Sequence, residues 1–420
     1  MAEMGAEAGE DARRAIELAA RQSYGKLLAF IAGRTGDLAG AEDALSDAFA
    51  TALQSWPEQG VPRSPEAWLL AIARRRLIDD ARRRRTRTEA TQSLLQLAEE
   101  FAAAGDTMDI PDDRLRLMFA CAHPALPTEV HAPLMLQAVL GFDAGTIASA
   151  FLVAPATMGQ RLVRAKRKIQ EAGIPFRVPE PEELRERLGP VLEAIYAAFA
   201  EGWADPAGAV LRRRDLAEEA IWLGRLVASL LPDEPEALGL LALMLHAEAR
   251  RAARRDESGG FVPLDRQDPA RWDARLEGEA ESLLMAASRM GRIGRFQLEA
   301  AVQSAHAARR QSGRTDWAAI LELYDALLAE TESPVVAINR AVVLAELQGP
   351  AVGLAALDSL ADDRRLVEYQ PYWAARAGLL ALARKTEAAE DAYDRAIGLE
   401  ADPVVRQFLQ KRRAELRVTD

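Results

Sequence analysis

The 420-residue sequence is 49% hydrophobic and 28% charged, with a formal net charge of −11. This composition is ordinary for a folded globular protein and excludes wholesale disorder. No stretch approaches the roughly 18 uninterrupted apolar residues of a membrane span, and the acidic N-terminus lacks the basic and apolar segments of a signal peptide. Cys121 is the single cysteine, which excludes an internal disulfide framework and a cysteine-cluster metal site. We therefore expect a cytoplasmic protein.

The net charge alone would argue against DNA binding, but the charge is unevenly distributed. Residues 1–180 carry 22 Lys and Arg against 24 Asp and Glu, whereas residues 181–420 carry 31 against 40. Residues 74–87 hold eight arginines and two acids, and residues 161–168 hold five cations and no acid. An approaching phosphate backbone responds to the potential of such patches. The two basic segments therefore predict contact with two stretches of DNA.

The expected elements are all helical, because no stretch shows the alternation rich in Val, Ile and Thr that marks a strand. The first three helices are expected at residues 24–34, 38–55 and 65–85, with breaks at Pro57, Gly60, Pro62 and Pro65. Residues 86–111 are polar, Ala-rich and weakly periodic, which predicts a flexible tether. Residues 112–120 are expected to begin another helix, and residues 178–181 to form a domain boundary.

Residues 126–169 have the pattern of a helix-turn-helix. Ile147, Ala148 and Phe151 fall on one face of a first helix, and residues 152–154 form the turn. Pro155 suits the first position of the next helix, where its missing N–H has no partner to lose. The buried stripe of this second helix is then expected to be Met158, Leu162, Ala165 and Ile169.

The opposite stripe of the same helix is polar and basic: Thr157, Gln160, Arg161, Arg164 and Lys168. Side chains near the start of such a helix meet base edges, and cations further along meet phosphates. The alternative interpretation is an amphipathic helix whose basic face is only solvated. The turn, the buried stripe and the number of cations together favour DNA binding.

From about residue 182 the chain becomes a series of amphipathic helix pairs. Trp317, Leu321 and Tyr324 have the spacing of a repeat's first helix, and residues 372–403 resemble one tetratricopeptide unit of about 34 residues. Such repeats stack and leave a concave surface for partners. The sequence therefore predicts a repeat domain in this half.

Residues 20–176 resemble the extracytoplasmic-function sigma factors, the small members of the sigma-70 family. Residues 141–168 are similar to region 4, with matches at Ile147-Ala148, Thr157, Arg161-Leu162 and Arg164-Ala165. Residues 41–44 leading to Phe49 resemble region 2.2, and Trp68-Leu69, Ile72-Ala73-Arg74 and Ile78-Asp79 resemble regions 2.3–2.4. The departures from the family pattern are Ser46, Arg75 and Thr146, in place of Gln, Asn and Glu. The remainder resembles the subgroup with a C-terminal tetratricopeptide-like extension.

The resemblance implies a division of labour. Core RNA polymerase would be bound at its clamp helices through Glu42, Asp43, Asp47 and Phe49, and at its flap. The −10 element would be melted and read by regions 2.3–2.4. Its phosphates would be bound by four arginines, Arg74, Arg75, Arg82 and Arg83. A flipped base would be bound by residues 57–64. The −35 element would be read in the major groove by Thr157, Gln160, Arg161, Arg164 and Lys168. Trp68 is expected in the core, with stacking on single-stranded DNA as the alternative.

The expected layout is region 2 at 1–88, a flexible linker at 89–112, region 4 at 113–176 and a tetratricopeptide-like domain at 177–420. The last domain is expected to regulate the sigma regions by contact within the chain, or to bind a partner. The sequence has no phosphate loop, nucleophile elbow or convincing carboxylate pair, and only four histidines, so we expect no enzyme, no cofactor and no metal site. The alternative function is a one-component regulator, in which the helix-turn-helix binds an operator and the repeats sense a signal.

Overall fold

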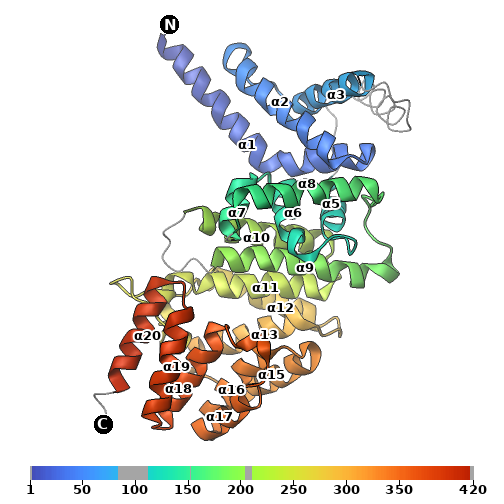
Figure 1. Ribbon diagram of the computed structural model, residues 1–420. Coiled ribbons are helices and arrows are strands. Elements are labelled where there is room, and N and C mark those ends of the chain that lie inside the picture. The colour runs from blue at the N-terminus through green and yellow to red at the C-terminus, as the bar shows by residue number, and fades with distance from the viewer. Residues whose placement is uncertain (1, 84–111, 152, 204–210, 417–420) are drawn as a thin grey trace. The chain divides into compact units, whose positions relative to one another are not determined.

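In the computed structural model the regular elements of the described residues are helices, apart from an isolated antiparallel bridge between Arg255 and Phe261. The structure describes residues 2–83, 112–151, 153–203 and 211–416. The chain divides into two compact units, Met1–Glu201 and Gly202–Asp420 (Figure 1). The expectation of an all-α fold is confirmed for the described part of the chain.

The first unit is built from two groups of helices. The first group is α1 (Ala2–Thr35), α2 (Leu38–Gln59) and α3 (Pro65–Arg83). The second group is α5 (Arg114–Cys121), α6 (Thr128–Leu140), α7 (Ala144–Ala150), α8 (Pro155–Glu171) and α9 (Pro181–Trp203). Helix α1 packs against α2, α5 and α6, and α2 also packs against α3 and α8. The two groups therefore share one core within this unit.

Two helices of the first group differ from the sequence expectation. Helix α1 begins at Ala2, well before the expected start at residue 24. Helix α2 continues through Pro57, where the sequence predicts a break, and ends at Gln59, followed by Gly60 with a φ of 86°. Proline removes one backbone donor and disfavours a helical residue before it. The residue before it here, Trp56, is only 2% exposed, and its packing holds the last turn in place.

The end of the first unit also differs from the expected domain boundary. Region 4 is expected to end at residue 176, but the compact unit continues along α9 to Glu201. Arg187 of α9 donates a hydrogen bond to the carbonyl oxygen of Phe119 in α5, at 3.3 Å. The expected linker at 89–112 lies outside the described residues except for its last position. Helix α5 begins at Arg114, close to the expected start.

The second unit is a succession of helices joined by short connections. Its first elements are α10 (Leu211–Leu230), α11 (Pro235–Ala249), η2 (Arg251–Arg254), η3 (Leu264–Arg266), η4 (Pro269–Arg271), α12 (Ala274–Ser288), α13 (Arg295–Ala307) and α14 (Arg309–Ser312). They are followed by α15 (Trp317–Thr331), α16 (Pro334–Gln348), α17 (Pro350–Asp358), η5 (Arg364–Leu366), α18 (Gln370–Leu382), α19 (Thr386–Leu399) and α20 (Pro403–Glu415).

Arginine side chains support the irregular segment between α11 and α12. Arg271 donates to the carbonyl oxygens of Arg255 at 2.8 Å and Ala252 at 2.7 Å. Arg309 reaches the same segment from α14 and donates to the carbonyl oxygens of Leu264 and Gln267, at 2.6 and 2.9 Å. These bonds join side-chain donors to backbone carbonyl oxygens of the segment, and so hold it against its neighbours.

Neighbouring helices in the last part of the chain pack as successive pairs, α15 on α16, α16 on α17 and α18 on α19. Tyr372, Ala389 and Tyr393 are buried in one cluster that α16 to α20 share. Trp317 and Tyr324 pack against Ile320 in a second cluster. The paired helices expected from the sequence are present, and their assignment to the tetratricopeptide class remains a prediction. Among the described residues, every helix is too short or too polar to span a bilayer.

Glu236, in the first turn of α11, caps a different helix. Its carboxylate accepts hydrogen bonds from the backbone N–H groups of Phe296 at 2.9 Å and Gln297 at 3.1 Å, in the first turn of α13. We expect Glu236→Ala to lower the free energy of unfolding by about 1–2 kcal/mol, because the first turn of a helix loses its acceptor. Urea denaturation measures this change.

The control is Glu346→Ala, at an exposed position of α16. Its expected effect is under about 0.5 kcal/mol, as for an ordinary surface substitution. Equal losses in the two variants would contradict the capping role of Glu236.

Candidate nucleic-acid interface

The first helix of the predicted helix-turn-helix is the short α7. Its N-terminus is capped by Asp143, whose carboxylate accepts from the backbone N–H of Thr146 at 2.9 Å and from the Thr146 hydroxyl at 2.5 Å. After α7 the chain turns, and the N–H of Val153 bonds to the carbonyl oxygen of Ala148 at 2.9 Å. Thr146, where the family pattern has glutamate, thus forms part of this cap.

Helix α8 follows the turn, with Pro155 in its first turn and Ala154 as N-cap residue. Ala154 has extended backbone angles, φ −61° and ψ 135°, and its methyl group forms no capping hydrogen bond. The apolar stripe of α8 is buried as the sequence predicts, at Met158, Leu162, Ala165 and Ile169. Helix α8 is therefore docked with its opposite face turned outward.

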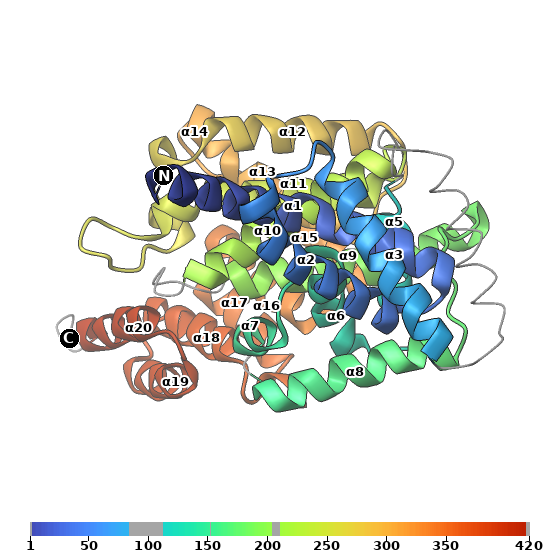
Figure 2. The same ribbon diagram turned by 90° about the horizontal axis from the view of Figure 1, so that it is seen from above.

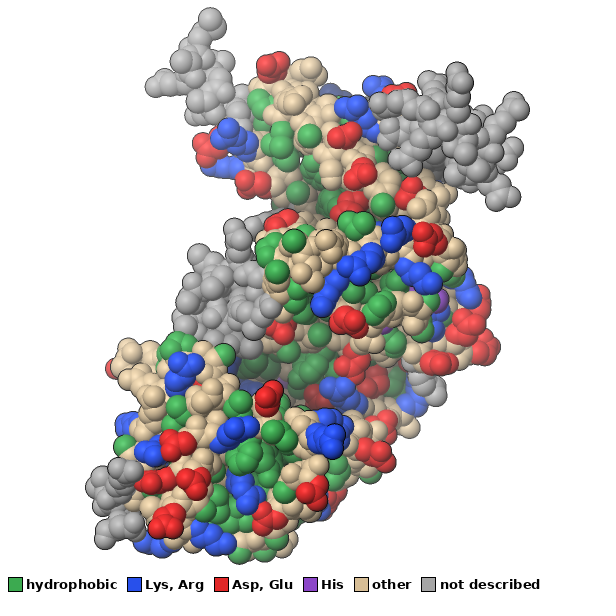
Figure 3. Space-filling view, viewed as in Figure 1, with side chains coloured by type: hydrophobic (Ala, Val, Ile, Leu, Met, Phe, Trp, Pro, Cys, Tyr) green, Lys and Arg blue, Asp and Glu red, His purple; other side chains and the backbone are tan. Residues whose placement is uncertain are grey.

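That outward face carries the side chains assigned to the −35 element. Thr157, Gln160, Arg164 and Lys168 are exposed and Arg161 is partly exposed. The Arg164 guanidinium donates to the side-chain oxygen of Gln160 at 3.3 Å. Figure 2 shows α8 next to α6, and Figure 3 shows a row of Lys and Arg side chains on the face where α8 lies. The structure thus brings the five residues together on one accessible surface.

The four residues assigned to polymerase docking lie on α2 in different environments. Asp43 and Asp47 are exposed, and Asp47 forms a surface ion pair with Arg76 at 3.6 Å. Phe49 is partly buried, with its ring centroid 6.2 Å from that of Tyr24. Glu42 forms an ion pair with Lys166 of α8, and only 15% of its side chain is exposed. Two of the four are therefore open to a partner and two are covered.

The residues assigned to the −10 element lie on α3. Arg75 is exposed and Arg74 is partly buried. Arg82 and Arg83 belong to the last turn of α3, but their side chains lie outside the described residues. Trp68 is half-buried with its ring edge-to-face against Trp56, at a centroid distance of 5.5 Å. Trp68 is thus part of the packing between α2 and α3.

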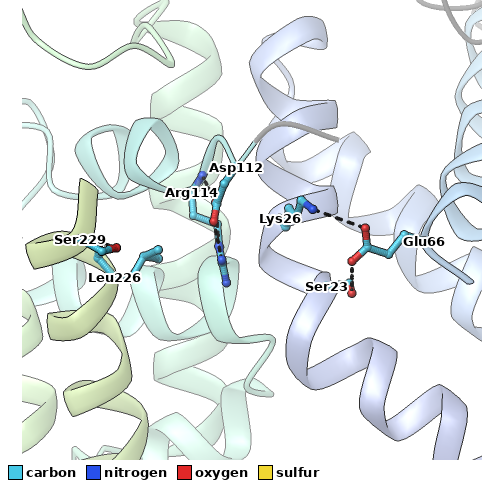
Figure 4. A network of polar contacts seen from close by, with 7 residues as sticks. All are labelled: Ser23, Lys26, Glu66, Asp112, Arg114, Leu226 and Ser229. Atoms are coloured by element: carbon cyan, nitrogen blue, oxygen red, sulfur yellow. Dashed lines mark hydrogen bonds and ion pairs between the residues drawn. The ribbon is translucent and has the colours of Figure 1, made fainter. Parts of the chain in front are cut away.

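A polar network that sequence spacing does not predict joins α1 to the start of α3. Glu66 accepts a hydrogen bond from the Ser23 hydroxyl at 2.6 Å and pairs with the Lys26 ammonium at 3.5 Å (Figure 4). Ser23 is buried, so its hydroxyl depends on this acceptor. The network fixes the beginning of the helix that carries Trp68 and the arginines. Its partners are about 40 residues apart, so no local pattern signals it.

The single cysteine and the histidine His131 lie in the interior of the part of the chain that the structure describes. Cys121 is fully buried in α5, and burial raises the pKa of its thiol. The His131 ring lies 3.1 Å from the carbonyl oxygen of Leu126, and burial lowers its pKa. Within the described ranges, no group of three or more His, Cys, Asp and Glu side chains is placed to hold a metal ion.

The uncapped start of α8 generates a prediction. Ala154→Ser or Ala154→Asp supplies an oxygen that can accept from the free N–H groups of the first turn, on a backbone already extended. We expect either variant to raise the free energy of unfolding by about 1 kcal/mol. Denaturant titration measures it. The control is Ala156→Ser, two positions further along α8. It should bring no gain, because residue 156 is already within the first turn and is not the N-cap residue.

Comparison with known proteins identifies two segments of the chain. Residues 20–87 match the family described as Sigma-70 region 2, and residues 187–288 match a family of unknown function, DUF6596. An uncharacterized protein of Rhizobium meliloti (strain 1021) is 40% identical over 390 residues, which cover 92% of this chain and 91% of that protein. No solved structure matches the chain.

The matched segments map directly onto the helices. The region 2 match runs from the middle of α1 through α2 and α3, and the second match runs from α9 through α12. The region aligned with the R. meliloti protein covers about nine-tenths of both chains. The chain therefore belongs to the same family as this R. meliloti protein, and its residues 20–87 are a region 2 domain of the sigma-70 family.

Proposed function

We propose that this protein is an RNA polymerase sigma factor of the extracytoplasmic-function type. It binds core RNA polymerase and directs transcription initiation at a small set of promoters. The observation that carries the proposal is the sigma-70 region 2 domain at residues 20–87. That domain packs in one compact unit with a docked helix whose outer face is basic.

In this proposal the outer face of α8 reads the −35 element. Thr157 and Gln160, near the start of the helix, reach base edges in the major groove. Arg161 and Arg164 bind bases or phosphates, and Lys168 binds a phosphate further along. The exposure of these side chains supports the assignment, because a DNA contact requires accessible donors. Region 4 is thus the part of the first unit that follows residue 112.

Helices α2 and α3 carry the remaining functions in this proposal. Asp43 and Asp47 on the exposed side of α2, together with Glu42 and Phe49, dock on the clamp helices of core polymerase. Arg74, Arg75, Arg82 and Arg83 on α3 hold the phosphates of the melted −10 region. The loop between α2 and α3 captures a flipped base. Because α2 ends at Gln59, that loop is shorter than the 57–64 segment expected from the sequence.

We also propose that the second unit is a tetratricopeptide-like regulatory domain acting on the sigma regions in the cytoplasm. Its successive helix pairs support the repeat assignment. Residues 181–420 carry 31 cations against 40 acids, so an acidic domain is joined to basic DNA-reading helices. Deleting it is expected to change the transcription that residues 1–201 direct. Unchanged output would contradict a regulatory role.

Transcription in vitro with core RNA polymerase on a pool of upstream DNA fragments tests the proposed function. The wild-type chain should give transcripts with discrete start sites. Arg161→Ala combined with Arg164→Ala should abolish them, because each lost base contact costs about 1–3 kcal/mol of discrimination. The control Arg177→Ala removes an exposed arginine beyond α8 that pairs with Glu180 and Glu183, and should leave the transcripts intact.

Two results would contradict the proposal. One is transcription that persists when both α8 arginines are replaced. The other is tight binding of promoter duplex by the chain alone, with a steep salt dependence and no effect of core polymerase. The second result would instead indicate a one-component regulator.

A further inference from the structure

The ion pair between Glu42 and Lys166 joins residues 124 positions apart, one on the proposed docking helix α2 and one on the DNA-reading helix α8. Only 15% of the Glu42 side chain and 11% of the Lys166 side chain are exposed. Lys166 lies beside the buried stripe of α8, half a helical turn away from Thr157 and the outward face. The lysine therefore meets α2 while the DNA-reading residues remain exposed.

The Tyr24 phenol lies in the same environment. Burial raises its pKa, and the nearby carboxylates Glu42 and Asp43 raise it further, so the ring stays neutral at all physiological pH values. Cys121 is a second neutral, buried group, and it lies near the charges of both Lys166 and Glu42. Lys166 thus balances the charge of Glu42 beside two neutral side chains, Tyr24 and Cys121. A carboxylate whose side chain is only 15% exposed, and which is already paired with Lys166, offers little surface to a partner outside the unit.

The backbones of the two helix groups approach closely beside this pair. A Cβ atom on Gly25 of α1 would lie 2.0 Å from the carbonyl oxygen of Val139 in α6. A Cβ atom on Gly141 would lie 3.1 Å from the ring of Tyr24. We call this contact surface between the two groups of helices the seam. Its part between α1 and α6 depends on the absence of a side chain at Gly25. A substitution there forces the two groups apart.

A third contact ties the same groups together near the C-terminal end of α1. Arg34 pairs with Asp113, at the N-terminus of α5, at 3.6 Å, and the Asp113 side chain is 9% exposed. Two ion pairs and one close glycine contact thus join the two groups of helices. The two sides of the seam are the proposed region 2, which carries the polymerase-docking residues, and the proposed region 4.

We propose that the first unit is held in a closed state, in which α8 and Lys166 cover the Glu42 end of the polymerase-docking surface and the unit must open before core polymerase binds. This inference rests on the proposed function. While α8 covers Glu42, polymerase cannot reach this carboxylate, so only the open fraction of the chain is competent. The apparent affinity for polymerase is lowered by that fraction. The closed state blocks polymerase docking and leaves the outer face of α8 free.

A reversible disulfide tests the proposal. A Cβ atom on Gly33 of α1 would lie 4.0 Å from the Cβ of Phe176, which follows α8, and this separation suits a disulfide. In the Gly33→Cys, Phe176→Cys chain, oxidation should lock the closed state and weaken binding to core polymerase by about tenfold or more. Reduction should restore it. The native Cys121 is fully buried and does not compete.

Gly25→Ala should have the opposite effect, because its Cβ atom displaces Val139 and favours the open state. We expect tighter binding to core polymerase and a longer distance between spin labels placed at the exposed Gln54 of α2 and Gln170 of α8. Gly33→Ala is the matched control on the same helix, since its Cβ has no contact shorter than 4.0 Å. Lys166→Met, which removes the ion pair without a backbone clash, should act like Gly25→Ala if the latter proves unstable.

The outcomes separate this inference from the proposed function. Equal polymerase affinity of the oxidised and reduced chains would overturn the closed-state inference and leave the sigma-factor proposal standing. Failure of the wild-type, reduced and Gly25→Ala chains alike to bind core polymerase would overturn the proposed function, and the inference with it. Lost affinity on oxidation, together with a longer label distance in Gly25→Ala, would establish the closed state as the inactive one.

Discussion

The apolar stripe of α8 fixes the orientation of the helix, and the arrangement of the first unit around the candidate site follows from it. Burial of a side chain such as Leu162 or Ile169 contributes roughly 1.5–3 kcal/mol, so a rotation of α8 that exposed the stripe would be strongly opposed. With that rotation fixed, Arg164 and Lys168 must face outward and Lys166 must face α2. One helix therefore divides its cations between an accessible surface and an internal contact.

The internal contact is suited to a state that opens. A half-buried ion pair gains Coulombic energy but loses hydration on both sides, so its net contribution to stability is small even where its geometry is good. The Glu42–Lys166 pair can therefore specify the closed arrangement without making separation of the helices prohibitive. The close contact at Gly25 adds to this selectivity, because it forms only where no side chain stands in the way.

The sequence predicted those features that depend on local periodicity. The buried stripe of α8, the position of Pro155 and the outward placement of Thr157 all follow from the helical repeat within one segment, and the structure has them. Contacts between distant segments could not be predicted in this way. Glu42 with Lys166 and Glu236 with the start of α13 join residues 124 and about 60 positions apart, and neither pair has a distinctive spacing.

The helices and the compact unit that continue past a local breaking signal have equally physical reasons. Pro57 is a local breaking signal that the burial of Trp56 overrides, and tertiary packing of this kind has no signature in a single turn of sequence. Helix α8 ends at Glu171, shortly before the boundary expected at residues 178–181. The compact unit continues beyond both, because α9 packs back onto α5 through Arg187. Helix-breaking residues thus give a local indication of where a helix ends, whereas contacts between helices decide where a compact unit ends.

The buried arginines of the second unit differ from the exposed arginines of α8. In the second unit Arg250 donates to Gln303, and burial together with the neighbouring Arg254 and Arg309 lowers its pKa to about 10, so it remains charged at neutral pH. Arg254 donates to the carbonyl oxygen of Trp203, and its guanidinium lies 4.5 Å above the ring of Trp203. Arg250 and Arg254 thus find their acceptors inside the second unit, on Gln303 of α13 and on Trp203 at the end of α9. On α8, Arg164 and Arg167 instead contact residues of their own helix, Gln160 and Glu171, and stay exposed. A run of arginines in a sequence therefore indicates an accessible basic surface only where the fold leaves the guanidinium groups on the outside.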